Sequence, residues 1–371
     1  MAEDPIRVLQ LIKCLDHGGA ERLLTTMVIR GDRARFRYEV AFARSEMRGL
    51  VGVLRDAGVP VHDLGARSDL DLAWTGRLRH LLAERRFEVV HAHLPYTAIL
   101  GRAVSRTLPP ARRPRLVYTE HSLWPHNARV VRWLGRATSR WDDVSIAVSE
   151  SNRAALPGAI RRRTRVIVHG VDVDAVRATE TRDLRSVLGI PEDHAVVLSV
   201  ANLRAQKGYP TLLRAARAMV DDGLPVTFLA LGAGPLEAEL RAEHGRLELA
   251  DRFRFLGQQA EALSFIASSD VLVLASDYEC MPVVVMEAFA LGTPVVATAV
   301  GELPAVVDDG VDGLLVPPAR PDQLAAALRR LIEHPDLRMR LGDAARQAVN
   351  RFDVRRASAD LEAVYAELAH R

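Results

Sequence analysis

The feature that most constrains the fold is the alternation, along the whole chain, of short apolar runs rich in β-branched residues with longer helical patterns. Near-continuous apolar strands separated by helices are typical of parallel sheets covered by helices on both faces. Two series of such strands predict an α/β protein with two doubly wound, Rossmann-like parallel-sheet domains. The first series comprises residues 7–12, 39–42, 88–91, 116–119, 144–148 and 165–168, and the second comprises residues 196–200, 226–229, 271–274 and 295–297.

A polar, turn-rich stretch over residues 170–192 separates the two series. A chain of 371 residues exceeds one ordinary hydrophobic core, which agrees with two domains. We therefore expect a first domain over residues 1–175 and a second over residues 176–352. A last helical pattern at residues 358–370 has no strand after it, and residues 353–371 are expected to cross back onto the first domain.

The composition, with 49% hydrophobic and 26% charged residues, is that of a globular protein. No apolar run reaches the roughly 18 residues that a membrane span needs, and the acidic start of the chain is unlike a signal peptide. Two cysteines, Cys14 and Cys280, are too few for a disulfide framework and indicate a reducing compartment. We expect a cytoplasmic protein, and a net charge of +3 gives no reason to expect nucleic acid as a partner.

Basic residues gather in the stretch RVVRWLGRATSR at residues 129–140. On a helix, Val130, Trp133, Leu134 and Ala137 would share one face and the arginines another. Basic amphipathic helices of this kind lie on anionic membrane surfaces, so a peripheral association with the inner face of a membrane is one interpretation. The alternative is the solvated face of an ordinary surface helix.

Ligands of open parallel sheets bind at the carboxyl ends of the strands, so functional residues are expected in the loops there. The loop after the first strand contains Gly18 and Gly19 and opens a helix, whose free N–H groups suit an anion. It lacks the G-x-G-x-x-G spacing, and the second strand ends in Ala43-Arg44-Ser45 without the acid that would hold an NAD ribose. These features disfavour a nicotinamide enzyme, and a plain strand-to-helix turn remains the alternative for the loop.

In the second half, Glu279 follows the strand at residues 271–274, and Pro282 suits the first turn of the next helix. Glu287 falls within that helix, in the apolar stretch VVVMEAFALG. A carboxylate in such surroundings is costly without a partner, and ligand hydroxyls are suitable partners. A Glu287 side chain that faces solvent is the alternative.

Three patterns that suggest a metal are discounted. Asp69-Leu70-Asp71 and Asp172-Val173-Asp174 have D-x-D spacing, but the first lies in a polar stretch and the second in the link between domains. No cysteine or acidic pattern completes a site around His91 and His93. His93 is instead a candidate for contact with an acceptor, with a structural role as the alternative, and no metal or other cofactor is expected.

Several motifs together resemble family 4 (group 1) glycosyltransferases, which have the two-domain GT-B fold with a cleft between the domains. Residues 279–287 and the following AFALGTPVVA resemble the E-x7-E signature of this family, and the match continues through residues 300–304 and 309–318. Residues 201–208 resemble its phosphate-binding loop and residues 231–235 its next glycine turn. The loop at residues 17–22, VHAH at 90–93 and YTEHS at 118–122 fit in the first half.

The resemblance implies roles for individual residues. Glu287 would accept hydrogen bonds from the ribose of the nucleotide, and Glu279 and His121 would contact the donor sugar. Lys207, assisted by Arg204, would neutralise the diphosphate as the glycosidic bond breaks. The remaining substrate-binding positions would be Gly18, Gly19, His93, Asn202, Gly232, Gly234, Cys280, Met281, Pro282 and Val283.

The activity implied is retaining, metal-independent transfer of a hexosyl unit from a nucleotide diphosphate sugar to a glycan, lipid-linked or small-molecule acceptor, in bacterial cell-surface polysaccharide or glycolipid synthesis. A nucleotide-sugar 2-epimerase and a non-catalytic nucleotide-sugar-binding descendant are the alternatives. Three positions depart from the family pattern: Cys280 replaces the usual Gly, Asn202 the usual Arg and His169 the usual Asn. Arg204 is expected to supply the guanidinium that Asn202 lacks.

Overall fold

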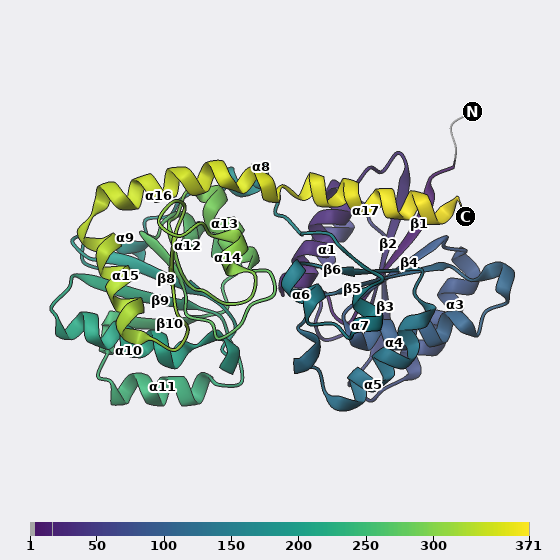
Figure 1. Ribbon diagram of the computed structural model, residues 1–371, viewed down its shortest axis with the longest axis horizontal. Coiled ribbons are helices and arrows are strands. Elements are labelled where there is room, and N and C mark those ends of the chain that lie inside the picture. The colour runs from purple at the N-terminus through teal and green to yellow at the C-terminus, as the bar shows by residue number, and fades with distance from the viewer. Residues whose placement is uncertain (1–3, 17, 371) are drawn as a thin grey trace. The chain divides into compact units, whose positions relative to one another are not determined.

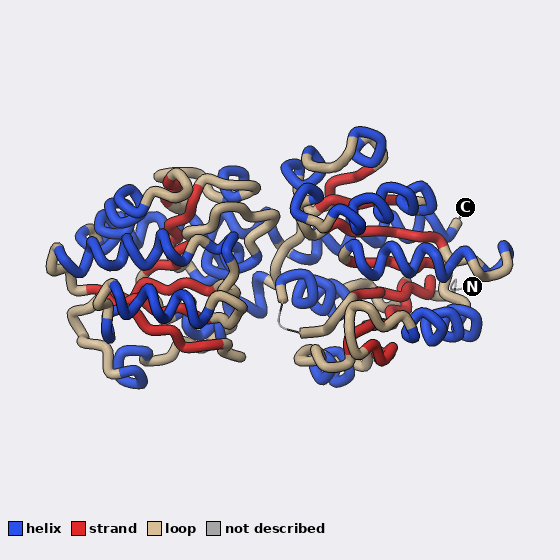
Figure 2. The backbone as a smooth tube through the Cα atoms, turned by 90° about the horizontal axis from the view of Figure 1, so that it is seen from below, coloured by secondary structure: helices blue, strands red, loops and turns tan. Residues whose placement is uncertain are grey.

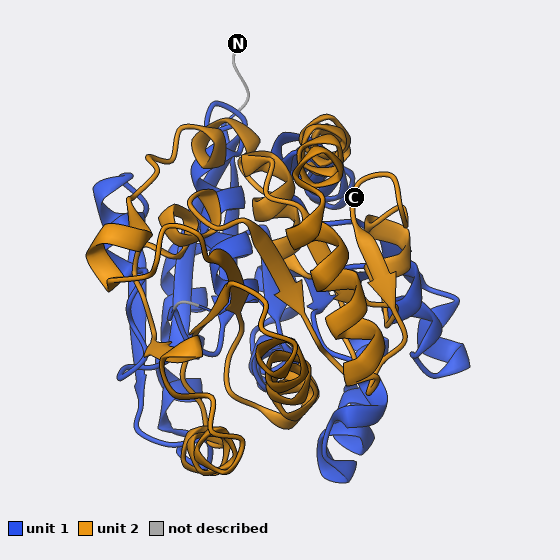
Figure 3. Ribbon diagram, turned by 90° about the vertical axis from the view of Figure 1, so that its left-hand side faces the viewer, with its two compact units in different colours: residues 1–170, 353–371 blue, residues 171–352 orange. Residues whose placement is uncertain are grey.

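The computed structural model describes residues 4–16 and 18–370, and its chain forms two compact units (Figures 1 and 3). The first unit comprises Met1–Gly170 and Asp353–Arg371, and the second comprises Val171–Phe352. The division therefore falls inside the polar link, a few residues before the expected boundary at 175/176. His17, which belongs to one of the motifs above, lies outside the described residues.

The first unit is built on a seven-stranded sheet in the order β3-β2-β1-β4-β5-β6-β7. All neighbouring strands are parallel. Parallel strands need crossover connections, which the helices between them provide. The strands are β1 (Ile6–Ile12), β2 (Phe36–Arg44), β3 (Val61–Ala66), β4 (Val89–His93), β5 (Arg115–Glu120), β6 (Val144–Ala147) and β7 (Thr164–Val166).

Helices lie on both faces of this sheet (Figure 2). Because successive side chains of a strand point to opposite faces, Val8 of β1 belongs to one apolar cluster and Leu9 to the other. Helices α1 and α17 cover the first face, and α3 and α4 cover the second. The helices are α1 (Gly19–Arg30), α2 (Val51–Asp56), α3 (Ala73–Arg85), α4 (Pro95–Arg106), α5 (Arg129–Thr138), α6 (Glu150–Ala154), α7 (Gly158–Arg161) and α17 (Val354–Ala369).

The second unit has a six-stranded parallel sheet in the order β10-β9-β8-β11-β12-β13. Its strands are β8 (Ala195–Val200), β9 (Val226–Leu231), β10 (Phe253–Gly257), β11 (Val271–Leu274), β12 (Val295–Thr298) and β13 (Leu314–Val316). Two apolar clusters again cover its faces. The helices are α8 (Val173–Arg177), α9 (Leu184–Leu188), α10 (Tyr209–Asp221), α11 (Glu237–Arg246), α12 (Ala262–Ala267), α13 (Val283–Leu291), α14 (Leu303–Val306), α15 (Pro321–Glu333) and α16 (Pro335–Ala348).

The C-terminal helix α17 packs on the first unit, where it contacts α1, β1 and β4. Leu361 and Tyr365 are buried in the cluster that α1 also covers. Glu362 accepts hydrogen bonds from the Asp32 N–H at 2.8 Å and the Tyr38 hydroxyl at 2.8 Å. These contacts fix the rotation of α17 about its axis, so Tyr365 is held over the sheet.

The structure confirms the predicted fold class, since both units are α/β with an all-parallel sheet. It also contains three strands that the sequence patterns did not predict, β3, β10 and β13, and each lies at the edge of its sheet. In both sheets the chain reverses its direction of growth beside the first strand of the unit, between β1 and β4 and between β8 and β11. Ligands of such sheets bind at these switch points.

Candidate functional site

The candidate site of the second unit lies at the carboxyl ends of β8 and β11, the neighbouring strands at the switch point. Residues 201–208 follow β8 and contain a short 3-10 helix, Ala205–Lys207, before α10 begins. Residues 275–282 follow β11 and lead into α13. The fold therefore brings together the two loops that the sequence singled out.

Glu279 and Lys207 form an ion pair between these loops, with 2.6 Å between Lys207 Nζ and Glu279 Oε1. The same carboxylate oxygen accepts a hydrogen bond of 2.7 Å from the Ser276 hydroxyl. Glu279 is only 7% exposed, so the ammonium group is the main compensation for its buried charge. Its second oxygen, Oε2, has no partner among the described residues and is available to a ligand hydroxyl.

Two glycines fix the backbone of the Glu279 loop. Gly208 has a φ of +61° and Gly301 a φ of +55°. A Cβ atom on Gly208 would clash with the carbonyl oxygen of Ala275, and one on Gly301 would clash with the carbonyl oxygen of Glu279. Both positions therefore require glycine for conformation and for space, and together they press the neighbouring loops against the segment that carries Glu279.

Gly232 and Gly234, predicted to bind substrate, pack against the β8 loop. A Cβ atom on Gly232 would clash with the Ala201 carbonyl oxygen, and one on Gly234 with the backbone of Leu203. This close approach of two loops already accounts for the absence of side chains at both positions. Contact between these glycines and a ligand stays a prediction.

The segment after Glu279 turns directly into α13. Pro282 is the N-cap residue of that helix, one position before its first turn, and Val283 is its first residue. Cys280 is not among the described residues with positive φ, so a side chain in place of glycine brings no left-handed strain. Cys280 and Met281 are half-buried, and Glu287 on α13 is 8% exposed.

Asn202 and Arg204 are both exposed on the β8 loop, three to five positions before the Lys207 side chain. Arg204 precedes the 3-10 turn that contains Lys207 and lies near Tyr278. Burial raises the pKa of Tyr278, and the positive charge of Arg204 opposes this rise. The loop therefore presents an exposed guanidinium near Tyr278, and a role of Arg204 toward a diphosphate stays a prediction.

In the first unit, Gly18 and Gly19 lie at the start of α1. Gly18 is the N-cap residue of α1, and a Cβ atom there would clash with the carboxylate of Glu21 in the first turn of that helix. The Cys14 thiol donates a hydrogen bond of 3.0 Å to Glu21 Oε1. Burial raises the pKa of Glu21 and raises that of Cys14 to about 12, so the thiol is protonated at neutral pH.

Histidines at the ends of β4 and β5 belong to a buried hydrogen-bond network, hereafter the histidine network. His121 Nε2 is 2.9 Å from His93 Nδ1, and His93 Nε2 is 2.8 Å from Gln10 Oε1. The Gln10 amide donates to the Tyr365 hydroxyl at 2.9 Å, which lies 2.6 Å from His91 Nδ1. The network comprises His121, His93, Gln10, Tyr365, His91 and Thr119, whose hydroxyl is 2.7 Å from His91 Nε2.

Burial lowers the pKa of His91, His93 and His121 well below its usual range, so these rings are neutral. With the amide oxygen of Gln10 toward His93, the proton of His93 is on Nε2 and its Nδ1 accepts from the Nε2–H of His121. His121 Nδ1 then carries a lone pair and has no partner among the described residues. With this arrangement of protons, Nδ1 of His121 is a hydrogen-bond acceptor without a partner among the described residues.

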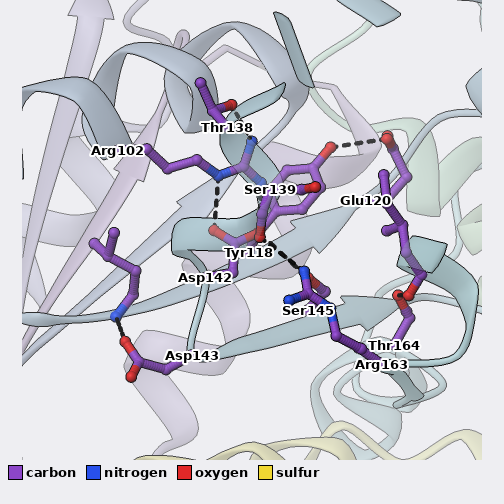
Figure 4. Close-up of polar contacts among 12 residues, drawn as sticks. Arg102, Tyr118, Glu120, Thr138, Ser139, Asp142, Asp143, Ser145, Arg163 and Thr164 are labelled. Atoms are coloured by element: carbon purple, nitrogen blue, oxygen red, sulfur yellow. Dashed lines mark hydrogen bonds and ion pairs between the residues drawn. The ribbon is translucent and has the colours of Figure 1, made fainter. Parts of the chain in front are cut away.

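The loop that carries His121 is held by a buried polar cluster (Figure 4). Glu120 accepts hydrogen bonds from the Tyr118 hydroxyl at 2.8 Å and from the backbone N–H of Ser122 at 3.0 Å. The guanidinium of Arg102 lies over the Tyr118 ring and makes two hydrogen bonds, of 2.7 and 2.6 Å, to Asp142. Because both neighbours of His121 are anchored, its ring position is set by the fold.

Backbone strain adjoins the same network at Leu94, which directly follows His93. Leu94 has φ 69° and ψ 148° and precedes Pro95, the first residue of α4. A non-glycine residue in this region costs of order 1–3 kcal/mol, and such residues cluster at functional sites. The strain at Leu94 therefore supports a functional interpretation of the end of β4.

The carboxylates of the two D-x-D patterns have protein partners. Asp69 pairs with Lys13 and Arg44, each at 2.8 Å. Asp172 caps α8 by accepting from the Ala175 N–H. Within residues 4–16 and 18–370, histidines, cysteines and carboxylates form no cluster of three that could hold a metal ion.

Helix α5 exposes two large apolar side chains, Val130 and Trp133, whereas Val131 and Leu134 are half-buried. Its buried side is formed by Gly135 and Thr138, whereas Val130 is 62% and Trp133 69% exposed. An ordinary surface helix would bury these apolar side chains. In the described part of the chain, every helix is too short or too polar to span a membrane.

Sequence patterns did not predict that Gln10 and Tyr365 belong to the histidine network, or that His169 contacts His121. Gln10 and Tyr365 lie 355 positions apart in the chain, and neither belongs to a motif. The ring of His169 stacks on that of His121, with 5.2 Å between centroids. The only available signal was polarity at strand positions that are otherwise apolar, as at Gln10 in β1.

Among solved structures, the chain resembles Anabaena Alr3699/HepE in complex with UDP and glucose, with a TM-score of 0.86 and 24% identity over 98% of this chain and 100% of that one. It also resembles the sucrose-phosphate synthase from Thermosynechococcus elongatus, with a TM-score of 0.82 and 22% identity over 98% and 99% of the two chains. These similarities confirm the predicted GT-B fold.

Among curated proteins, the D-inositol 3-phosphate glycosyltransferase of Saccharomonospora viridis is 35% identical over 224 residues, which are 57% of this chain and 51% of that protein. The alpha-D-kanosaminyltransferase of Streptomyces kanamyceticus is 29% identical over 219 residues, 58% of this chain and 56% of that protein. The chain thus spans about half the length of these relatives.

Two family models together account for most of the sequence. The model "Glycosyltransferase Family 4" matches residues 17–175, and the model "Glycosyl transferases group 1" matches residues 180–348. The first match contains the histidines of β4 and β5, and the second contains both glutamates of the E-x7-E segment. The chain belongs to the group 1, or family 4, glycosyltransferases.

Proposed function

We propose that the protein transfers a hexosyl unit, with retention of anomeric configuration, from a nucleotide diphosphate sugar to a hydroxyl acceptor. The observation that carries this proposal is the arrangement around Glu279. One carboxylate oxygen is held by Lys207 and Ser276, and the other has no partner among the described residues. A carboxylate oriented in this way suits the hydroxyls of a donor sugar.

Lys207 and Arg204 provide the positive charge for the diphosphate. An ammonium group has three N–H donors, so Lys207 can keep Glu279 and also contact a phosphate oxygen. The leaving nucleotide diphosphate gains negative charge as the glycosidic bond breaks, and fixed cations lower the barrier to that step. In this scheme the leaving phosphate accepts the proton of the acceptor, so no protein base is assigned, and the two cations replace a metal ion.

Glu287 is assigned to the ribose hydroxyls of the nucleotide. It lies on the same helix that follows the Glu279 loop, with nearly all of its surface covered. Titration calorimetry and thermal shift with UDP and UDP-glucose, the ligands of the Anabaena structures, test the donor site. A ligand at 100 times its dissociation constant stabilises the folded state by about 2.7 kcal/mol. A panel of uridine, guanosine and adenosine diphosphates and their sugars that gives no shift would contradict the proposal.

Transfer is then measured with the stabilising donor and a set of glycan, lipid-linked and small-molecule acceptors. NMR of the product reports whether the anomeric configuration is retained. Release of a changed sugar nucleotide without any acceptor would instead indicate an epimerase. Binding without turnover for every acceptor would favour a non-catalytic descendant.

The outward face of α5 favours an acceptor held at an anionic membrane, as in the synthesis of bacterial cell-surface polysaccharides or glycolipids. Trp133 and Val130 would enter the interface, and the neighbouring arginines would contribute about 1 kcal/mol each near anionic lipid. Cosedimentation with phosphatidylglycerol vesicles should show salt-sensitive binding that Trp133→Ser weakens. Met339→Ser is the matched control, because Met339 on α16 is similarly exposed. If the wild-type protein does not bind at low salt, the solvated-face interpretation holds.

A further inference from the structure

His169 follows β7 and lies in the link that leads into the second unit. Its side chain is 3% exposed, and neither ring nitrogen has a hydrogen-bond partner among the described residues. Its ring stacks on that of His121, with an interplanar angle of 12°. A polar ring is therefore buried against a predicted donor-sugar residue without a polar contact of its own.

This arrangement opposes folding. A buried polar group without a hydrogen bond destabilises the folded state, whereas an apolar ring of similar shape would keep the stacking. Burial lowers the pKa of His169 to about 4, so the ring is neutral at physiological pH. A neutral imidazole has one N–H donor and one acceptor nitrogen.

Such a ring matches a hydroxyl group, which also donates one hydrogen bond and accepts another. It matches a phosphate less well, because neither His169 nor His121 is charged. The stacked neighbour adds an acceptor, since the histidine network leaves the Nδ1 lone pair of His121 without a partner among the described residues. Two stacked side chains thus carry ring nitrogens without a hydrogen-bond partner among the described residues, and the hydroxyl groups of a sugar are suitable partners for them.

We propose that His169 is a sugar-binding residue that hydrogen-bonds a hydroxyl group of the transferred hexose or of the acceptor. The inference rests on the proposed function and adds His169 to the residues of the first unit that are predicted to contact sugar. The proposed partner of the His169 ring is a hydroxyl group, and the experiment below shows whether this group belongs to the donor sugar or to the acceptor substrate.

The test compares three variants. His169→Phe keeps a ring and removes both nitrogens, and His169→Gln keeps a donor and an acceptor. His194→Phe is the matched control, because His194 Nδ1 lies 2.9 Å from the Thr227 hydroxyl, at the amino end of β8 and away from the candidate site. For each protein we would measure the melting temperature without ligand, the affinities for UDP and UDP-glucose, and the KM for the acceptor found in the screen.

His169→Phe should raise or preserve the melting temperature and leave the affinity for UDP unchanged. It should weaken UDP-glucose binding or raise the acceptor KM by about tenfold, the effect of one lost hydrogen bond. The affected quantity identifies the source of the hydroxyl group, and His169→Gln should restore most of the loss. His194→Phe should lower the melting temperature and change neither ligand constant.

Unchanged sugar and acceptor constants in His169→Phe would overturn the inference. A lowered melting temperature together with an equal loss of UDP affinity would also overturn it, because that result indicates a structural role. Failure of the proposed function is distinguishable, since the wild-type protein itself would then bind no sugar nucleotide.

Discussion

Replacing Gly301 with alanine should displace Glu279 without touching its side chain. Gly301 has a φ of +55°, and its missing Cβ atom would clash with the carbonyl oxygen of Glu279. Gly310 offers a matched control in the same unit, with a φ of +76° and no atom within 4 Å of the missing Cβ. Both alanine variants carry left-handed backbone strain, and only Gly301→Ala adds the clash.

The expected magnitudes follow from this difference. Left-handed strain costs roughly 1–2 kcal/mol in either variant. To reach van der Waals contact, the new methyl group of Gly301→Ala and the Glu279 backbone must separate by more than about 1 Å, and forced packing adds about 1–3 kcal/mol. A displacement of about 1 Å at a reacting centre can lower turnover about 100-fold. Gly310→Ala should keep turnover within about a factor of two.

Melting temperatures and initial transfer rates are measured for both variants alongside the wild-type protein. Affinity for UDP provides a third readout, because Glu287 lies on α13 and not in the loop that Gly301 touches. We expect Gly301→Ala to retain UDP binding and lose turnover. Wild-type turnover in Gly301→Ala, or an equal loss in Gly310→Ala, would refute the assignment of Gly301 as the residue that positions Glu279.

Three further predictions concern the charges of the site and one concerns pH. Glu287→Ala should weaken UDP binding, whereas Glu279→Ala should mainly reduce turnover; equal losses in calorimetry would contradict this division. Transfer should continue in EDTA, and a rate that requires added magnesium or manganese would reject a metal-independent site. Arg204→Ala should lower turnover on the order of 100-fold, and Asn202→Arg should restore part of it if the guanidinium acts on the diphosphate. Burial lowers the pKa of His169 from 6.5 to about 4, so the free energy of unfolding should fall by about 3 kcal/mol in total as the pH drops through this window. In denaturation curves recorded across the window, His169→Phe should remove that contribution.

The strands that escaped prediction share one physical property. β3, β10 and β13 are edge strands, so each has a single neighbour and a partly exposed surface. Their sequences, VHDLGA, FRFLG and LLV, are short or carry polar residues and do not form the long apolar runs of central strands. The apolar pattern reports burial on both faces of a sheet, and it therefore identifies the interior of each sheet better than its edges.

In the second unit, the positions of several candidate site residues could be predicted because these residues are close together in the sequence. Glu279, Pro282 and Glu287 occupy one strand-loop-helix segment. In the structure, Glu279 lies in the loop, Pro282 is the N-cap residue of α13, and Glu287 is buried within that helix. The ion-pair partner of Glu279 was harder to predict from the sequence. Lys207 lies 72 positions away, and only the parallel pairing of β8 with β11 brings it within 2.6 Å.

The first unit shows why the remaining residues could not be predicted from patterns. His121 is hydrogen-bonded to His93, His93 to Gln10, and Gln10 to Tyr365 on the C-terminal helix. Each link joins a different secondary-structure element, so no window of sequence contains two successive members of the chain. The buried side chain of Tyr365 also depends on α17 docking, which Glu362 fixes through its hydrogen bonds to the first unit. The docking of the last helix and the hydrogen bonding of His121 are therefore connected, because the rotation of α17 that buries Tyr365 places its hydroxyl beside the Gln10 amide, which in turn contacts His93.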